Sequence, residues 1–552
     1  MTKRKARRRK EPFERRELRL DELQGIVERA KTAPLTEADY ATLKAAVETL
    51  AFLTQELAAK GTSIERLRKL LFGPSTEKTS QVFGATPAGA GQGASPAGTD
   101  AAAKPKAPGH GRNAAAAYSG AEKVKVPHPA LEGGNRCPEC QKGKVYALAE
   151  PAVLVRIRGM APLAATVYEC ARLRCNLCGE VFTAETPAGV GPEKYDETVG
   201  SMVGLLKYGA GLPFNRIEKL QHGMGIPLPA ATQWELVQRA AGLLAPAQEE
   251  LILEAAQGDV LYNDDTTAKI LELGRETQVQ AAASGSEAEE RTGVFTSGIV
   301  STRDGHRIAL FFTGRQHAGE NLTDVLAQRA ALLQAPIQMC DALSRNLPAE
   351  LETIVAHCLA HARRRFVDVV NDFPDECRYL LETLQKVYHH DALARQQGLL
   401  PEERLRFHQT ESGPLMAELE EWLRTEIDEH RVEPNSGLGE AIGYMRKHWS
   451  ELTLFLRVPA APLDNNLCER ALKKAILHRK NALFYKTLNG ARVGDTFMSL
   501  IHTAELNAVA PFDYLVALQR YHHEVVANPA EWMPWNYHES LARRPKGPDP
   551  PP

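Results

Sequence analysis

Cysteine and long apolar runs are both scarce in this sequence. Its nine cysteines in 552 residues are too few, and odd in number, for a scaffold held together by disulfides. No uninterrupted apolar stretch approaches the ~18 residues that cross a bilayer, and no apolar segment follows the basic N-terminus as in a secretory signal. These absences argue against secreted disulfide-rich proteins and membrane proteins, so we expect a soluble protein of the reducing cytoplasm.

An excess of either charge is also missing, since the formal net charge is only -2. Hydrophobic residues at 43% and charged residues at 25% are ordinary globular values and exclude a wholly disordered or fibrous chain. At ~150 residues per domain, the length predicts three or four domains. Lysine and arginine nevertheless gather at 1–16, 464–500 and Arg363–Arg365. Such patches permit binding to a polyanion, although a single run is more often a solvated surface.

The N-terminal third divides into three expected segments. Residues 1–36 form a basic tail, and residues 84–120 are a low-complexity Ala, Gly and Pro linker that we expect to be disordered. Between them, at 37–83, apolar residues recur every seven positions: Leu43, Leu50, Leu57, Ile64 and Leu71. This spacing predicts a coiled-coil helix, and an amphipathic helix packed on its own protein is the alternative.

Two Cys-x-x-Cys pairs flank a strand-like spacer within residues 121–192. Four thiolates in this arrangement can surround one zinc ion in a zinc ribbon, and metal binding supplies folding energy that so small a module lacks. A thioredoxin-like redox site is the weaker interpretation, because it needs one such pair in a βαβ setting. The predicted zinc ligands are Cys137, Cys140, Cys175 and Cys178.

Residues 193–256 show two helical patterns separated by glycines and prolines. This arrangement is typical of a helix-turn-helix, but an ordinary helical hairpin fits the spacing equally well. After it, strands alternate with helices, which predicts an α/β core. The expected strands lie at 258–266, 293–301, 306–312, 336–340 and 353–357.

The α/β core is expected in two parts, 257–378 and 458–515. A charged and mostly helical stretch, 379–457, separates them and is interpreted as an insertion into the sheet domain. Residues 516–552 form a C-terminal tail. The fold class is therefore a multidomain α/β protein with a helical insertion in its sheet core, preceded by a coiled-coil helix, a zinc ribbon and a helical segment.

Acidic residues stand at places where such a core can build a site. The strand 258–266 ends in carboxylates, and the strand 336–340 is followed by Asp341, at the edge of an open sheet where sites form. Glu469 lies in a later helix for which Asp464 or Asn465 is a plausible N-cap. Carboxylates brought together repel unless cations such as paired Mg²⁺ ions compensate. On spacing alone the bland alternative stands: a strand-end acid is often a turn former, and Glu469 could pair with a nearby lysine.

Several motifs resemble the transposases of the insertion-sequence-66 family. These are LYNDDT, CDALSRN, AHCLAHARRRF, PLDNNLCERAL and HRKNALF, and the likeness extends in order over most of the chain. The family consists of DDE-type enzymes with a ribonuclease-H-like catalytic core. The resemblance therefore implies that the mixed sheet here is ribonuclease-H-like.

The resemblance also implies the residues of the site. Asp264, Asp341 and Glu469 would be the catalytic acids, binding two Mg²⁺ or Mn²⁺ ions. Asp265 competes with Asp264 for the first role, and because adjacent strand residues face opposite ways, only one of them can point at the metals. The residues implied to contact DNA phosphate or the scissile group are His361, Arg364, Arg470, Arg479 and Lys480.

As function, the resemblance implies a bacterial transposase that binds the terminal inverted repeats of its element, frees a 3′-hydroxyl at each end and transfers that end into target DNA. The implied partners are double-stranded DNA, a second protomer or a higher oligomer, and accessory proteins of the same element, with a nucleoid-associated location. Two alternatives stay open: an inactive DNA-binding regulator derived from a transposase, and a related metal nuclease such as a junction resolvase.

Overall fold

The computed structural model describes residues 193–276, 293–349 and 351–544, together with short pieces within 26–44 and 132–187. The chain forms two units, Met1–Gly89 and Ala90–Pro552. Most of the expected basic tail and coiled coil, the whole linker at 84–120 and the four predicted zinc ligands lie outside the described residues.

Within the predicted zinc-ribbon segment, the structure describes a short antiparallel hairpin. Its strands are β1 (Arg172–Arg174) and β2 (Val181–Thr183), with Leu173 opposite Phe182. The Gln221 side-chain amide donates to the carbonyl oxygen of Leu163 at 3.1 Å, which ties the end of this segment to the helices that follow.

The centre of the second unit is a five-stranded mixed sheet, which confirms the expected α/β class. In spatial order the strands are β5 (His306–Gly314), β4 (Phe295–Arg303), β3 (Val260–Thr267), β6 (Ile337–Cys340) and β7 (Ile354–His357). The first three pair antiparallel and the last three parallel. Each matches a predicted strand within a few residues.

The tight hairpin between β4 and β5 follows from its two turn residues. Arg303 pairs with His306, so only Asp304 and Gly305 form the loop, and both have positive φ, at 49° and 81°. A two-residue turn of this kind matches the twist of the flanking strands and favours Asp-Gly.

Helices cover both faces of the sheet. On one face lies α8 (Ala318–Leu326), where Asn321 donates to Ser297 Oγ of β4 at 2.9 Å. On the other lies α15 (Asn466–Ala482), whose Cys468 Sγ donates to the carbonyl oxygen of Gly298 at 3.3 Å. A Cβ at position 298 would lie only 3.0 Å from the Leu472 side chain, so glycine permits this close approach.

The free edge of β5 is closed by a helix, α16 (Leu488–Leu506), instead of another strand. Polar side chains four residues apart accept hydrogen bonds from alternate backbone N–H groups of β5: Asp495 from Thr313 at 2.7 Å, Ser499 from Phe311 at 3.0 Å, Thr503 from Ala309 at 3.0 Å and Asn507 from Arg307 at 3.3 Å. Four helical residues rise ~6 Å and two strand residues ~6.8 Å, so the two repeats stay in register and the edge is satisfied.

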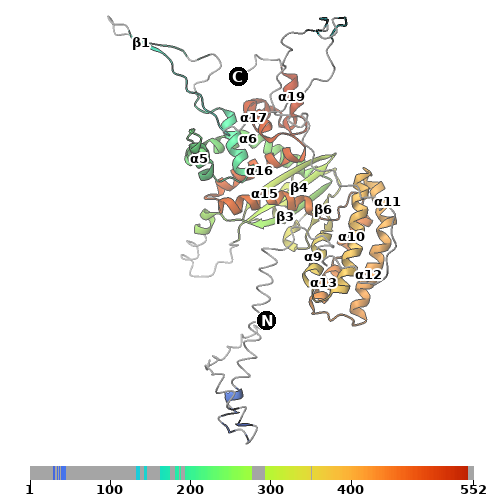
Figure 1. Cartoon of the computed structure of the whole chain (residues 1–552). Helices are drawn as coiled ribbons and strands as arrows, with labels where there is room; N and C mark the ends of the chain where they lie inside the picture. Colours follow the sequence, from blue (N-terminus) through green and yellow to red (C-terminus); the bar gives the residue numbers. More distant parts are fainter. Residues whose placement is uncertain are drawn as a thin grey trace. The chain divides into compact units, whose positions relative to one another are not determined.

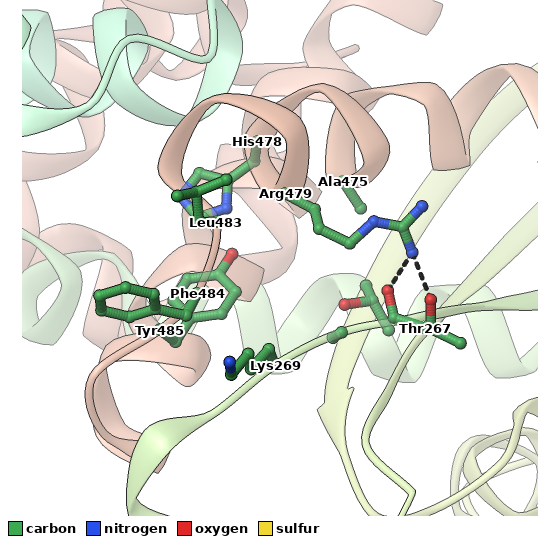
Figure 2. A pocket seen from close by; sticks show the side chains of 10 residues that line it. Thr267, Lys269, Ala475, His478, Arg479, Leu483, Phe484 and Tyr485 are labelled. Carbon is green, nitrogen blue, oxygen red and sulfur yellow. Dashed lines mark hydrogen bonds between the residues drawn. The ribbon is translucent and has the colours of Figure 1, made fainter.

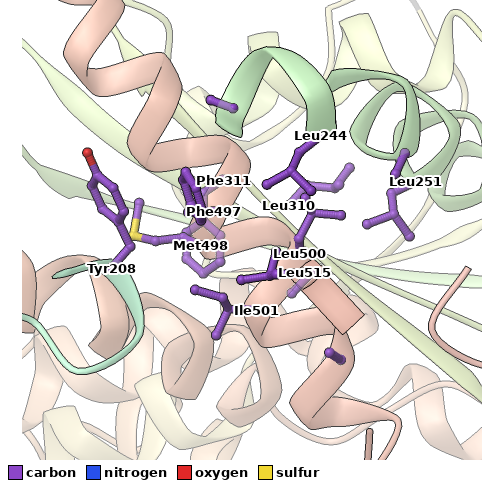
Figure 3. Packing of buried hydrophobic residues seen from close by; sticks show 14 of the residues in the cluster. Tyr208, Leu244, Leu251, Leu310, Phe311, Phe497, Met498, Leu500, Ile501 and Leu515 are labelled. Carbon is purple, nitrogen blue, oxygen red and sulfur yellow. The ribbon is translucent and has the colours of Figure 1, made fainter. Parts of the chain in front are cut away.

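The main hydrophobic core lies between the sheet and the helices on either side of it in sequence. Figure 3 shows Phe311 of β5, Phe497 of α16 and Leu244 of a preceding helix packed together, and all three are fully buried. The helices that precede the sheet are α4 (Glu197–Gly204), the π-helix η2 (Leu205–Gly209), α5 (Phe214–Gly223) and α6 (Ala230–Ala256).

Two expected segments differ from their predictions. The second helix of the helix-turn-helix-like segment, α6, is 27 residues long and buries apolar residues along its length, so core packing accounts for its pattern. The expected C-terminal tail is folded through residue 543, and Trp532 and Tyr537 are buried. Its elements are α17 (Pro511–Arg520), α18 (His522–Ala527), η5 (Pro529–Trp532) and α19 (Tyr537–Arg543).

The stretch between the two parts of the core is helical, as expected, but its first long helix begins at Pro374 instead of 379. After η3 (Ser344–Asn346) and α9 (Leu359–Val369), the helices are α10 (Pro374–Gln396), α11 (Pro401–Glu411), α12 (Gly413–Asp428), α13 (Gly437–Lys447), α14 (Trp449–Leu452) and η4 (Leu454–Leu456). Figure 1 shows α10 to α13 gathered beside the β6 side of the sheet. No helix of the described residues is long and apolar enough to span a membrane.

One buried carboxylate holds the helical insertion together. Asp391 of α10 pairs with Arg404 at 2.7 Å and Arg395 at 2.9 Å and contacts His408 Nε2 at 3.3 Å. These hydrogen bonds and cations lower the pKa of Asp391 to about 2 although burial opposes them. Arg404 also donates to the carbonyl oxygen of Ala461 at 2.9 Å, so the same group joins the insertion to the segment that returns to the sheet.

We expect Ser499→Ala to lower the free energy of unfolding by about 1–3 kcal/mol, because it leaves the buried Phe311 N–H without an acceptor. The measurement is the shift in the urea unfolding curve. Ser450→Ala, at an exposed site, is the control and should change stability by no more than about 0.5 kcal/mol. Equal effects for the two variants would contradict the edge-closing role of α16.

Candidate active site

The paired acids on β3 point to opposite faces of the sheet. Asp265 faces α8, where its Oδ2 lies 2.8 Å from His317 Nδ1 and its Oδ1 lies 3.3 Å from Arg345 Nη2. Asp264 lies opposite Gly298, the glycine covered by α15. Asp265 is thus engaged by two basic side chains, while Asp264 faces the helix that carries Glu469.

Asp264 stands in an environment that disfavours its charge. Burial and, to a smaller extent, the carboxylates of Asp341, Asp265 and Glu469 together raise the pKa of its carboxyl to about 7. A hydrogen bond of 2.8 Å from the backbone N–H of Asp265 acts in the opposite direction and is outweighed. The three predicted acids are therefore near enough for Asp341 and Glu469 to affect the charge of Asp264.

Asp341 follows the last residue of β6, beside β3 in the parallel half of the sheet. Its Oδ1 accepts hydrogen bonds from Asn346 Nδ2 at 2.5 Å and from the backbone N–H of Leu343 at 3.3 Å. Asn346 is held in turn, because Asn263 and Gln338 each donate to its carbonyl oxygen at 2.7 Å. The hydrogen bonds among Asn263, Gln338 and Asn346 thus orient the Asp341 carboxylate.

Glu469 lies in the first turn of α15, and the preceding Asn465 fixes that helix to the sheet. The fully buried Asn465 side chain donates to the carbonyl oxygen of Asn263 at 3.0 Å, and its backbone N–H donates to Cys358 Sγ at 3.3 Å. Asn465 is the N-cap residue but makes no capping hydrogen bond; Asp464 instead accepts from the backbone N–H of Asn466 at 3.1 Å. Asp464 therefore supplies the hydrogen bond to the start of the helix, while Asn465 anchors the helix to the sheet.

Glu469 has a second neighbourhood besides the two aspartates. Its Oε1 lies 3.8 Å from His361 Nε2, and ligand atoms of Glu469, His361 and Cys358 all lie within 4.8 Å of one another. Among the described residues, the trio of Asp264, Asp341 and Glu469 does not form a group that tight. The carboxylates of Asp341 and Glu469 thus act on the pKa of Asp264, while Glu469 also lies close to His361 and Cys358.

The predicted DNA-contacting residues occupy the same side as α15 but differ in their surroundings. Arg364, Arg470 and Lys480 are exposed. Arg479 is engaged within the chain: its Nη1 donates to Thr266 Oγ1 at 3.1 Å and to Thr267 Oγ1 at 2.6 Å. Figure 2 shows this side chain reaching across to β3, beside a pocket that Tyr485 also lines. In the structure Arg479 ties the end of α15 to the strand of Asp264.

The donor set around Asp264 fits hard divalent cations. Carboxylate oxygens are the ligands that Mg²⁺ and Mn²⁺ prefer. The pKa of Asp264 is raised chiefly by burial and in smaller part by neighbouring carboxylates, so the charged form of this side chain is disfavoured without a compensating cation. Bound cations would supply that compensation.

Sequence reasoning did not find the residues that support the acids. His317 and Arg345 engage Asp265 from other segments, and no spacing rule links them to it, although Arg345 lies in the CDALSRN motif. Asn346 stands inside the CDALSRN motif that carried the family resemblance, so that motif was the available signal. Asn465 was noticed only as a helix cap.

The metal-free protein should lose stability as the pH rises from about 4 to about 7. The folded-state pKa of Asp264 lies above the ordinary value of 3.8 for an aspartate. The folded state therefore retains a proton that the unfolded state has lost, and the penalty persists above pH 7. The substitution Asp264→Asn removes this penalty, because the amide side chain carries no charge. With a chelator present, we expect this variant to gain several degrees in melting temperature over the parent at pH 8 and much less at pH 5.

Mg²⁺ gives the complementary readout. It should raise the melting temperature of the parent at pH 8 more than that of Asp264→Asn, because binding to the folded state stabilises it. Asp324→Asn, at an exposed carboxylate on α8, should behave like the parent. A pH-independent difference between Asp264→Asn and the parent would contradict the charged, desolvated environment described for Asp264.

Comparison with known proteins agrees with this arrangement. The family model "Transposase IS66 family" matches residues 194–493, more than half of the chain. Two relatives from Sinorhizobium fredii (strain NBRC 101917 / NGR234) carry the names uncharacterized protein y4jD and uncharacterized protein y4hP. The first is 27% identical over 433 residues, covering 74% of this chain and 79% of the relative; the second is 26% identical over 438 residues, covering 75% of each. The chain belongs to the IS66 family of transposases.

Proposed function

We propose that this transposase binds the terminal inverted repeats of its element and catalyses metal-dependent cleavage and strand transfer with Asp264, Asp341 and Glu469. The observation that carries the proposal is the convergence of these acids, from β3, the end of β6 and α15, around an Asp264 carboxyl whose pKa is raised to about 7.

The sheet supports a ribonuclease-H-like core. Its order β5-β4-β3-β6-β7 places two antiparallel hairpin strands on one side of β3 and two parallel strands on the other. Asp264 is on the central strand, and Asp341 follows the neighbouring strand at the carboxyl edge, where open α/β sheets form their sites. The helical insertion lies between Asp341 and the helix of Glu469, as in the arrangement expected from the sequence.

The three acids act together in this proposal. Asp341, held by the amide network of Asn346 and Asn263, would bind divalent cations together with Asp264 and Glu469. Two Mg²⁺ or Mn²⁺ ions would supply charge stabilisation of the attacking and leaving oxygens of a phosphodiester. Glu469 lies on α15, a helix that Asn465 fixes to the backbone of β3 next to Asp264.

The surroundings of the acids suit a polyanion. The exposed Arg470 follows Glu469 in α15, Lys480 lies further along the same helix, and the exposed Arg364 belongs to α9, the helix of His361. Guanidinium groups match phosphate geometry, and a row of cations beside the acids would hold the DNA backbone across the site. His361, whose Nε2 lies 3.8 Å from Glu469 Oε1, would contact the scissile phosphate.

The N-terminal segments complete the proposal. The zinc ribbon with Cys137, Cys140, Cys175 and Cys178 and the helical segment after it would recognise the transposon ends, with the basic tail adding phosphate contacts. The coiled coil at 37–83 would pair protomers, since two symmetric ends require at least a dimer. Accessory proteins of the element remain among the proposed partners.

Removing any of the three acids should abolish cleavage without abolishing DNA binding. We expect Asp264→Ala, Asp341→Ala and Glu469→Gln to lower strand cleavage of a cognate end by at least ~10³-fold, because electrostatic stabilisation of the transition state is lost. The measurement is a nicking assay with Mg²⁺, alongside a gel-shift titration.

Asp324→Asn is the control for this assay and should cleave normally. Near-normal cleavage by one of the three variants would remove that residue from the site. Binding without cleavage by the parent protein itself would favour the regulator derived from a transposase, and cleavage without transfer to a second duplex would favour a nuclease such as a resolvase.

Disrupting the zinc ribbon should affect end binding first. We expect Cys175→Ser to weaken binding to a cognate end by at least ~10-fold while the thermal unfolding of the sheet core is unchanged, because the loss of one thiolate removes the metal that folds the module. Gel-shift titrations of this variant and of Cys377→Ser, a buried cysteine of the helical insertion, are the test. Unchanged end binding by Cys175→Ser would separate the ribbon from DNA recognition.

A further inference from the structure

A buried histidine at the end of β7 lacks a hydrogen-bond partner. His357 is only 7% exposed, and its Nδ1 atom has no hydrogen-bond partner among the described residues. An imidazole nitrogen that is removed from water without a partner is unfavourable, so such a group indicates that something binds there. The proposed DNA chemistry does not use His357.

Two further ligand-type side chains reach His357 from the helical insertion. His448 precedes α14, and Glu451 lies within it, three residues on and therefore on the same face of the helix. One ligand atom from each of His357, His448 and Glu451 lies within 4.8 Å of the others. The two imidazole rings meet edge to face, with centroids 4.9 Å apart.

The two histidines are in the form that binds metals. Burial lowers the pKa of His357, with a contribution from His448, and burial also lowers the pKa of His448. Both imidazoles are therefore neutral at pH 7, and neutral imidazole is the ligating species. The partly buried Glu451 adds a carboxylate, so the group offers two nitrogens and one oxygen.

We propose that His357, His448 and Glu451 bind a Zn²⁺ ion that fastens the helical insertion to the C-terminal end of β7. Two imidazoles with one carboxylate is a ligand set typical of zinc, and it differs from the all-oxygen set that suits Mg²⁺. This site lies outside the proposed catalytic acids and does not depend on their role or on the zinc ribbon.

The fastening would act on the part of the insertion that touches the active-site edge. Cys340, the residue before Asp341, is the register partner of His357. In the helix before His448, the Tyr444 hydroxyl lies in hydrogen-bond contact with the backbone of Ala342, directly after Asp341. A metal at His448 and Glu451 would thus hold α13 and α14 against the strand ends that carry the proposed site.

Metal content of the full-length protein tests the proposal. Protein dialysed against trace zinc is analysed for first-row metals by plasma mass spectrometry. We expect His448→Ala and Glu451→Gln each to hold one zinc per chain fewer than the parent, with His389→Ala, at an exposed histidine of α10, as the matched control. In the Cys175→Ser background, zinc X-ray absorption should show nitrogen and oxygen neighbours without sulfur.

A variant of Glu469 distinguishes between the two groups of side chains that could bind a metal ion. Glu469→Gln should keep the zinc, because Glu469 belongs to the separate group with Cys358 and His361. Zinc lost from Glu469→Gln but kept in His448→Ala would place the ion in that other group and overturn the proposal. Unchanged zinc in both His448→Ala and Glu451→Gln would also overturn it. Glu451→Gln keeps the volume of the side chain, so it separates metal loss from misfolding, which circular dichroism monitors.

Discussion

The site depends on the unfavourable charge of Asp264. This carboxyl is buried against α15 and shares its surroundings with other acids, which together raise its pKa to about 7. A protein gains no stability from such an arrangement, because an uncompensated buried charge is costly. A bound divalent cation would supply the positive charge that makes this arrangement favourable. The neighbouring Asp265 shows the contrast, since His317 and Arg345 engage it on the opposite face of the same strand.

The rest of the core holds this arrangement in place. Asn465 links the Glu469 helix to the strand of Asp264 and, through Cys358, to the start of α9. Gly298 lets α15 approach the sheet closely enough for that link. At the far edge, the polar row on α16 closes β5, so the sheet presents no open edge there. The helical insertion is joined to the returning segment through Arg404.

Local patterns predicted the parts of this fold that local rules govern. The sequence pattern predicts the strands, and Asp341 follows the end of β6 as expected, whereas Asp264 lies within β3, which continues to Thr267. The partners of those acids were not predictable in this way. These partners, Asn346, Arg345 and His317, contact the acids in the folded chain. Arg479, which is predicted to contact DNA phosphate, donates hydrogen bonds to Thr266 and Thr267 in this structure. The glycines and prolines before α6 predict the break that precedes it, and the helix then runs to Ala256, the expected end of the segment.

The position of bound manganese is the most direct measurement of the central claim. Crystals of the protein with Mn²⁺ and a cognate end, examined by anomalous diffraction, should show manganese in contact with the carboxylates of Asp264, Asp341 and Glu469 together. Manganese held by Glu469 with His361 and Cys358, and absent from Asp264, would contradict the account.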